Sequence, residues 1–101
     1  GEAFDASRFD GVRFLVRGNG EVYNLHLKTA ATQMPWQSYR AEFIAGPNWT
    51  EMRLPFHAFE PHRLVPRLDP RQLRRIALVA IGRSMQAHLC VTDIGFYADN
   101  N

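Results

Sequence analysis

Residues 12–28 read VRFLVRGNGEVYNLHLK, and this pattern indicates the kind of fold. Apolar and polar residues alternate on both sides of the Gly-Asn-Gly at residues 18–20, with the period of two that is typical of half-buried β-strands. Asn-Gly tolerates the positive φ angles of a tight turn. We therefore predict two antiparallel neighbouring strands joined by a hairpin, with Tyr23, Leu25 and Leu27 facing inward.

Further strands follow from the same alternation, and they account for most of the remaining chain. We predict them at residues 38–45, 49–54, 76–81 and 87–97. Residues 76–81 are apolar on both faces, so we expect that strand to be central and covered on both sides.

The last predicted strand contains an irregularity in its apolar pattern. Ile94 and Phe96 are one residue out of step with Leu89 and Val91. A β-bulge near Thr92 and Asp93 would bring all four apolar side chains to the core.

Residues 56–68 carry two prolines and show no clear period, so we predict a long loop anchored by Phe56 and Phe59. Asp69 as an N-cap followed by Pro70 at the first helical position predicts one short helical turn. The sum is an all-β chain: an antiparallel β-sandwich that forms a single domain over residues 1–101.

Composition excludes several classes of protein. The chain has 101 residues, of which 46% are hydrophobic and 22% charged, as in an ordinary globular domain. Its longest apolar run is too short to cross a bilayer, so we expect no membrane span. Cys90 is the only cysteine, which excludes an intrachain disulfide and any multi-cysteine metal site.

The basic residues are almost all arginine, which a GC-rich bacterial genome would explain. They are densest at residues 63–75, where an anionic partner such as RNA or lipid headgroups is one interpretation. No aromatic stacking pattern accompanies them, so we favour a solvated edge and expect no nucleic-acid binding.

Few residues suggest catalysis or metal binding. His88 and Cys90 lie two apart on a predicted strand, but a cysteine packed inside the sandwich is the interpretation we favour over a Cys–His pair. His57 and His62 lack a third ligand of matching spacing. We therefore expect no catalytic residue, no metal and no cofactor.

One polar surface remains as a candidate binding site. It combines the outward residues of two predicted strands with a tryptophan in the adjoining loop, and it could hold a sugar or a peptide, although an ordinary solvated sheet face has the same pattern. The residues are Asn24, His26, Lys28, Trp36, Arg40 and Glu42.

Several short segments, in their order and spacing, resemble the NADH:ubiquinone oxidoreductase complex I intermediate-associated protein 30 family. They are FLVRGNG at residues 14–20 with Tyr23, SYRAEF at 38–43, Trp49, LPF at 54–56 with Phe59 and Pro61, Ile76, Ile81-Gly82 and LCVTDI at 89–94. The resemblance implies a galactose-binding-domain-like jelly roll and a role in assembling respiratory complex I.

From this resemblance we expect a non-catalytic, assembly-factor-like module that binds a protein partner, such as a respiratory-complex subunit or an assembly intermediate. A carbohydrate-binding module is the alternative, on the analogy of the fold. The localisation would be cytoplasmic in a bacterium and mitochondrial in a eukaryote.

The family domain usually begins with further strands and a Met-Gly-Gly segment, which nothing in residues 1–101 matches. We therefore expect this chain to be the C-terminal part of a longer family domain. An exposed strand edge would follow, with the apolar residues 76–81 as its most adhesive part, and a homodimer through that edge is a further expectation.

Overall fold

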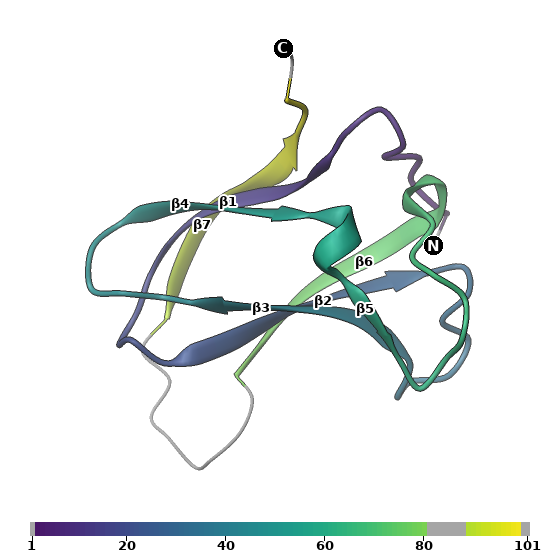
Figure 1. The fold of residues 1–101 in the computed structure, drawn as a ribbon, viewed down its shortest axis with the longest axis horizontal. Coiled ribbons are helices and arrows are strands. Elements are labelled where there is room, and N and C mark those ends of the chain that lie inside the picture. The colour runs from purple at the N-terminus through teal and green to yellow at the C-terminus, as the bar shows by residue number, and fades with distance from the viewer. Residues whose placement is uncertain (1, 81–88, 100–101) are drawn as a thin grey trace.

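The computed structural model describes residues 2–80 and 89–99 and shows a β-sandwich (Figure 1). Its strands are β1 (Gly11–Arg17), β2 (Val22–Thr29), β3 (Ser38–Ile44), β4 (Thr50–Pro55), β5 (Glu60–His62), β6 (Leu73–Ala80) and β7 (Cys90–Tyr97). Two short 3-10 turns, η1 (Phe56–Ala58) and η2 (Pro70–Gln72), are the helical elements of the described residues. The predicted all-β, antiparallel sandwich is confirmed.

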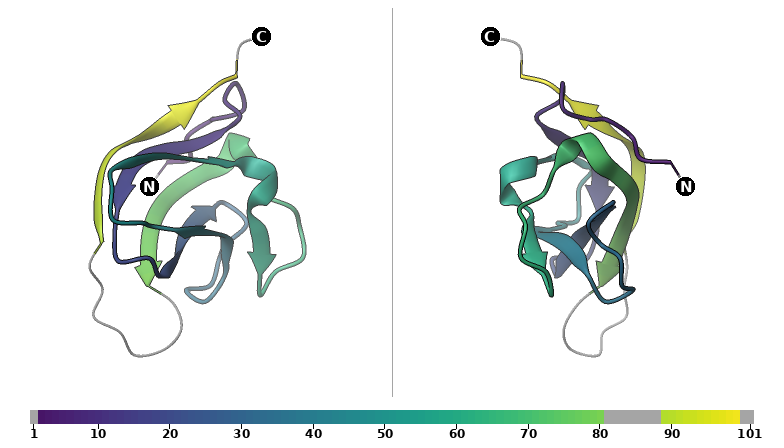
Figure 2. Two further views of the ribbon diagram at one scale, coloured as in Figure 1. Left: turned by 60° about the vertical axis from the view of Figure 1, so that its left-hand side comes forward. Right: turned by 90° about the vertical axis from the view of Figure 1, so that its right-hand side faces the viewer.

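The strands form two sheets that face each other. One has three strands in the order β4-β1-β7, and the other has four in the order β5-β3-β2-β6. Every pairing is antiparallel. In both views of Figure 2 the strands β6 and β7 lie along the same flank of the sandwich.

The core lies between the sheets and is built from alternate residues of each strand. Val12, Phe14 and Val16 of β1 are buried, as are the inward residues of β2 and β3. The rings of Phe14 and Phe43 meet edge to face with centroids 5.1 Å apart, which joins the two sheets at their centre. Alternation thus placed the inward faces of these strands correctly.

The predicted hairpin between β1 and β2 is wrong. β1 pairs with β4 and β7, whereas β2 pairs with β3 and β6, so residues 18–21 carry the chain from one sheet to the other. Residues 45–49 make a second crossing, from β3 to β4. The two crossings lie side by side, because the Gly18 amide donates to the Gly46 carbonyl (2.7 Å) and the Gly20 amide donates to the Ala45 carbonyl (2.7 Å).

The conformation of the first crossing explains the error. A two-residue hairpin of the Asn-Gly type needs positive φ at both central residues. Gly20 has a φ of 84°, but Asn19 is not among the residues with positive φ. Asn19 instead accepts a hydrogen bond from the Tyr23 hydroxyl through its side-chain oxygen (2.6 Å), which fixes the entry into β2.

The expectation that residues 76–81 form a central strand is also wrong. In the described part of the chain β6 is an edge strand, paired with β2 and, at Leu73 alone, with Phe4. Its outward residues Ala77 and Val79 are apolar but only half-buried. Because both faces of the strand are apolar, its sequence has the same pattern as a strand covered on both sides. Ile81 lies outside the described residues.

The bulge predicted near Thr92 and Asp93 is confirmed. The register of β1 and β7 shifts between Arg13 and Leu15, and Asp93 has a φ of 59°. Ile94 does not join the core, however, since 47% of its surface stays exposed. Ile94 follows the bulge on β7, which is an edge strand of the three-stranded sheet. In the described chain no further strand lies beside β7 to shield this side chain.

Cys90 was expected inside the sandwich but is exposed. It pairs with Arg17 of β1 at the start of β7, and because Val91 packs against the core, its neighbour Cys90 faces outward. His88 lies outside the described residues, so the Cys–His pair has no geometry to report.

The predicted loop at residues 56–68 contains two elements, η1 and β5. The prolines and the short length of both elements hid them from a periodicity argument. Phe56 and Phe59 are buried as predicted. The predicted helical turn is confirmed as η2, where the Asp69 carboxylate accepts a hydrogen bond from the Arg71 amide (3.0 Å).

The crossing at residues 18–21 makes a testable prediction. Gly20→Val should destabilise the fold by about 1–3 kcal/mol, because a β-branched residue resists positive φ. Nothing lies within 4 Å of the position of the new Cβ, so the cost is backbone strain rather than a clash. Asn19→Asp keeps the oxygen that Tyr23 binds and is the control. Equal urea midpoints for the two variants would contradict this account.

Candidate functional site

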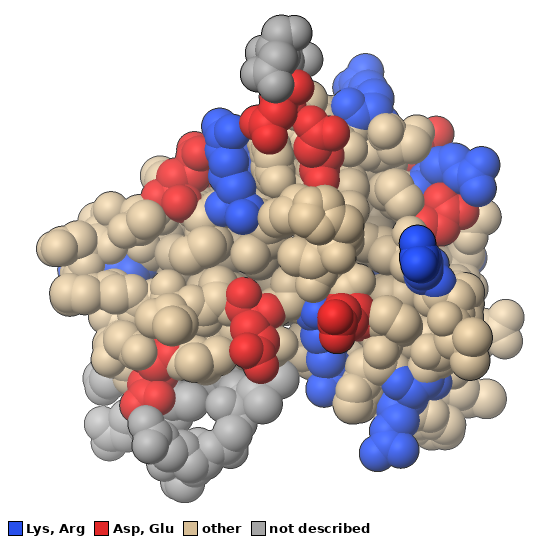
Figure 3. Space-filling model, viewed as in Figure 1, with Lys and Arg blue, Asp and Glu red and all other residues tan. Residues whose placement is uncertain are grey.

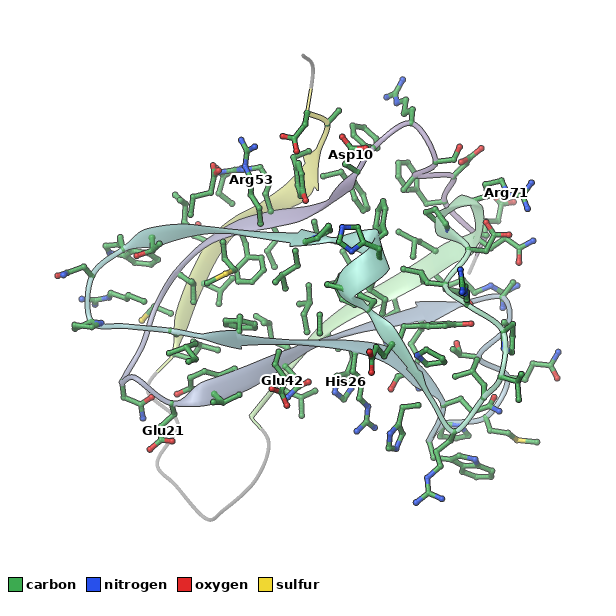
Figure 4. All side chains as sticks on the ribbon, viewed as in Figure 1. Asp10, Glu21, His26, Glu42, Arg53 and Arg71 are labelled. Carbon is green, nitrogen blue, oxygen red and sulfur yellow. The ribbon has the colours of Figure 1, made fainter. Side chains whose placement is uncertain are left out.

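The outer face of the four-stranded sheet carries polar side chains from neighbouring strands. The register of β2 and β3 places Asn24 opposite Glu42 and His26 opposite Arg40. Their neighbours along each strand belong to the core, so these four side chains share the outer face. Figure 4 shows His26 and Glu42 leaving the sheet on that side.

The edge strand β5 adds two residues that sequence reasoning missed. Glu60 lies opposite Arg40, and His62 lies opposite Ser38. The Glu-Pro-His sequence of β5 is too short to show a period, and Pro61 argues against a strand except at a sheet edge, where β5 lies.

These residues surround a hollow of about 590 Å³ on the outer face. Its lining residues are Asn24, Arg40, Ala41, Glu42, Ala58, Glu60, Pro61 and His62. Acidic and basic side chains lie next to one another over this sheet in Figure 3.

The charged side chains around the hollow form no ion pair with one another in the described residues. Arg40 donates through Nε to the hydroxyl of buried Ser38 (2.9 Å), which holds the arginine stem against the sheet. Among the ion pairs of the described residues, none includes Arg40, Glu42 or Glu60. A ligand therefore meets a guanidinium and two carboxylates that can still form charged hydrogen bonds.

Lys28 holds part of the adjoining loop in place. Its ammonium donates to the carbonyls of Pro35 (2.8 Å) and Gln37, and so holds the loop that precedes β3. Burial, together with the charges of Arg40 and Arg75, lowers the pKa of Lys28. Lys28 is absent from the lining of the hollow.

Trp36, in the loop that precedes β3, is not among the residues that line the hollow. Lys28 holds the carbonyls on both sides of Trp36, and 60% of the tryptophan surface is exposed. The structure therefore brings together Asn24, Arg40 and Glu42 at the hollow, without Trp36 among its lining residues.

His26 lies at the middle of the face and is half-buried. Its Nε2 atom is buried and has no hydrogen-bond partner among the described residues. Burial, followed by the charges of Arg40, Lys28 and His62, lowers the pKa of His26 from its ordinary value of 6.5. Burial and the charges of Arg40 and Arg63 lower the pKa of His62 as well. Both imidazoles thus favour the neutral form at neutral pH, in which one nitrogen donates and the other accepts.

Residues 2–80 and 89–99 offer no support for two other kinds of function. They hold no group of three or more His, Cys, Asp or Glu side chains arranged to bind a metal ion. They also hold no helix that is long and apolar enough to span a membrane.

The sequence matches one known protein family. A family model described as complex I intermediate-associated protein 30 matches residues 1–91. No curated protein and no solved structure gives a significant match.

The depressed pKa of His26 predicts how stability depends on pH. Protonation favours the unfolded state, in which the pKa is higher, so the free energy of unfolding should fall as the pH drops from about 7 to about 5. His26→Gln should reduce this fall, since it removes a group that gains protons on unfolding. Urea melts at several pH values measure the effect, and His57→Gln on exposed η1 is the control. An unchanged pH dependence in His26→Gln would contradict the assignment.

Proposed function

The chain belongs to the complex I intermediate-associated protein 30 family, and from this premise we propose that it is a non-catalytic, assembly-factor-like module that binds a protein partner. The partner is a respiratory-complex subunit or an assembly intermediate, and the binding surface is the outer face of the four-stranded sheet. In a bacterium the module acts in the cytoplasm, and in a eukaryote it acts in the mitochondrion.

The observation that carries this proposal is the hollow with charges of both signs. Arg40, Glu42 and Glu60 face it without an ion pair in the described chain. Unused charges on a surface provide complementarity to a chosen partner and penalise the wrong one.

A pair of exposed apolar side chains lies beside the hollow on the same face. Val22 and Ile44 lie opposite each other at one end of β2 and β3, with 39% and 62% of their surfaces exposed. A small apolar pair beside polar, unpaired groups is the composition of many protein–protein contacts. The face therefore suits a folded protein surface better than a small apolar ligand.

A carbohydrate is the second candidate ligand. Asn24, Arg40 and His62 are donors and Glu42 and Glu60 are acceptors around one hollow, which suits the hydroxyl groups of a sugar. The lining residues include no Phe, Tyr or Trp ring on which a sugar could stack. We rank this candidate below the protein partner for that reason.

A charge reversal on the face tests the main proposal. Glu42→Lys changes an exposed residue and should leave the fold intact while it abolishes most partner capture. The immobilised chain is exposed to detergent-solubilised membranes of the source cell, and mass spectrometry identifies what it retains. Complex I subunits or assembly factors should be retained by the unmodified chain and lost with Glu42→Lys.

Glu2→Lys makes the same charge change away from the sheet face and should retain the captured proteins. Equal capture by both variants would move the partner surface elsewhere. Failure of the unmodified chain to retain any complex I protein would contradict the function itself. Saturable sugar binding that Glu42→Lys abolishes would favour the carbohydrate reading instead.

We also propose that the open edge of β6 pairs with β6 of a second copy. Beyond Leu73, residues 76–80 have no neighbour on the side away from β2 in the described chain, and they carry no charge. An antiparallel, two-fold pairing would place the arginines at positions 74 and 75 at the ends of the contact, away from each other. Inward residues Ile76 and Leu78 are only half-buried, so pairing would also cover apolar surface.

Ala77→Lys should prevent this dimer, because lysines from the two copies would meet near the two-fold axis. Sedimentation velocity at micromolar concentration should show a dimer for the unmodified chain and a monomer for Ala77→Lys. Ala58→Lys, at an exposed position of η1 away from β6, is the matched control and should remain dimeric. A monomeric unmodified chain would refute edge pairing.

A further inference from the structure

Two loops at one end of the sandwich expose large apolar side chains. The loops are residues 30–37, between β2 and β3, and residues 63–69, between β5 and η2; together we call them the loop tip. Met34 is 48% exposed, Trp36 60% and Val65 92%. Single exposed apolar residues are ordinary, whereas three on two loops that a hydrogen bond joins concentrate exposed apolar side chains at one end of the sandwich.

The loop tip is held in place by hydrogen bonds between its loops and the sheet. The Gln37 side chain donates to the Arg63 carbonyl (3.0 Å), which ties the two loops together. The Tyr39 hydroxyl donates to the Pro66 carbonyl (2.8 Å), and Lys28 holds the carbonyls beside Trp36. The apolar side chains therefore extend from a supported scaffold.

Basic side chains surround the loop tip. The register of β2 and β6 shifts between Lys28 and Thr29. Because of this irregularity, the consecutive residues Arg74 and Arg75 both line the same hollow as Lys28. The hollow measures about 560 Å³, and Met34 is among its lining residues, which joins the cations to the apolar tip.

The loops themselves add further arginines, Arg63 and Arg67, and Arg71 follows in η2. Asp69 is paired with Arg71 at 3.0 Å, and hydrogen bonds from Ser7, with a smaller contribution from the charge of Arg71, lower the pKa of Asp5. Among the ion pairs of the described residues, none includes Lys28, Arg63, Arg67, Arg74 or Arg75. Figure 3 shows blue side chains along this right-hand end, where Figure 4 labels Arg71.

We propose that the loop tip docks on the surface of an anionic phospholipid bilayer. Met34, Trp36 and Val65 enter the headgroup region, and Arg74 and Arg75 bind lipid phosphates beside Lys28. Charge complementarity selects this occupant: unpaired cations attract anionic headgroups while apolar side chains gain from the acyl boundary. Trp is the side chain best suited to that boundary, since its ring is apolar and its N–H is polar.

This docking uses one end of the outer face, that of Lys28 and Arg75, whereas the partner surface proposed above extends from Glu42 toward the other end. The loop tip lies at the start of β3, whereas Val22 and Ile44 mark the opposite end of the outer face. A membrane-bound molecule would thus keep Glu42 and its neighbours free for a protein.

The experiment uses the presence of only two tryptophans in the chain. Trp49 follows the far end of β3, so Trp49→Phe leaves Trp36 as the sole fluorescent tryptophan at the tip. Vesicles of phosphatidylcholine containing about 30% phosphatidylglycerol should shift the Trp36 emission to shorter wavelength, and added salt should weaken the binding. Pure phosphatidylcholine vesicles should have little effect.

Cosedimentation with the anionic vesicles then compares variants in the unmodified background. Arg74→Gln with Arg75→Gln should weaken binding by about tenfold or more. Arg17→Gln with Arg53→Gln removes the same charge elsewhere and should retain most of the binding. Trp36→Ser with Val65→Ser should lose binding to a similar extent as the tip arginine pair.

Several outcomes would overturn the proposal. Equal losses for the two arginine pairs would assign the binding to net charge alone. Binding without a shift in Trp36 emission would exclude insertion of the tip. Absence of vesicle binding, or binding of inorganic phosphate as strong as that of vesicles, would refute a bilayer surface as the ligand. None of these outcomes depends on whether Glu42→Lys loses its protein partner.

Discussion

The hydrogen bonds between the two sheet crossings are the constraint on which the architecture depends. Gly18 and Gly20 donate to the carbonyls of Gly46 and Ala45 at 2.7 Å each, so the chain changes sheets twice at the same place. As a result the pair β1–β4 lies over the pair β2–β3, and Phe14 meets Phe43 across the interior. Had β1 and β2 formed a hairpin, their inward residues would have shared one sheet and left the opposite layer without a partner.

The crossings also determine which surfaces remain for function. With β2 and β3 inside the four-stranded sheet, their outward residues form a polar face with a hollow in it, and β5 lies at the edge of that hollow. Arg40 is held by Ser38, yet its charge is not neutralised by an ion pair within the described chain. The opposite sheet uses its charges differently: Arg13 bridges Glu51 (3.0 Å) and Asp93 (3.1 Å) across three strands. The charged residues of the three-stranded sheet thus form ion pairs between its strands, whereas those of the four-stranded sheet remain available to a ligand.

The two ends of the sandwich differ as well. At the end with the two crossings, backbone amides donate to backbone carbonyls of the neighbouring turn. There the Arg17 guanidinium also stacks over the Trp49 ring, with 5.4 Å from its carbon to the ring centroid. At the loop end, backbone carbonyls are held by side chains such as Lys28, Gln37 and Tyr39, which leaves longer loops with exposed apolar residues. A binding module of the complex I intermediate-associated protein 30 family would thereby present two chemically distinct surfaces.

The sequence by itself determined every strand except β5, the inward faces of β1 to β4, and the outward grouping of Asn24, Arg40 and Glu42, because side-chain alternation is a local property of an extended chain. It also located the bulge at Asp93 and the cap at Asp69. Strand partners required the tertiary structure, since alternation is identical in a hairpin and in a crossing between sheets. For the same reason Glu60, His62 and the paired placement of Arg74 and Arg75 emerged only from long-range registers: a three-residue strand and a register shift have no period to read.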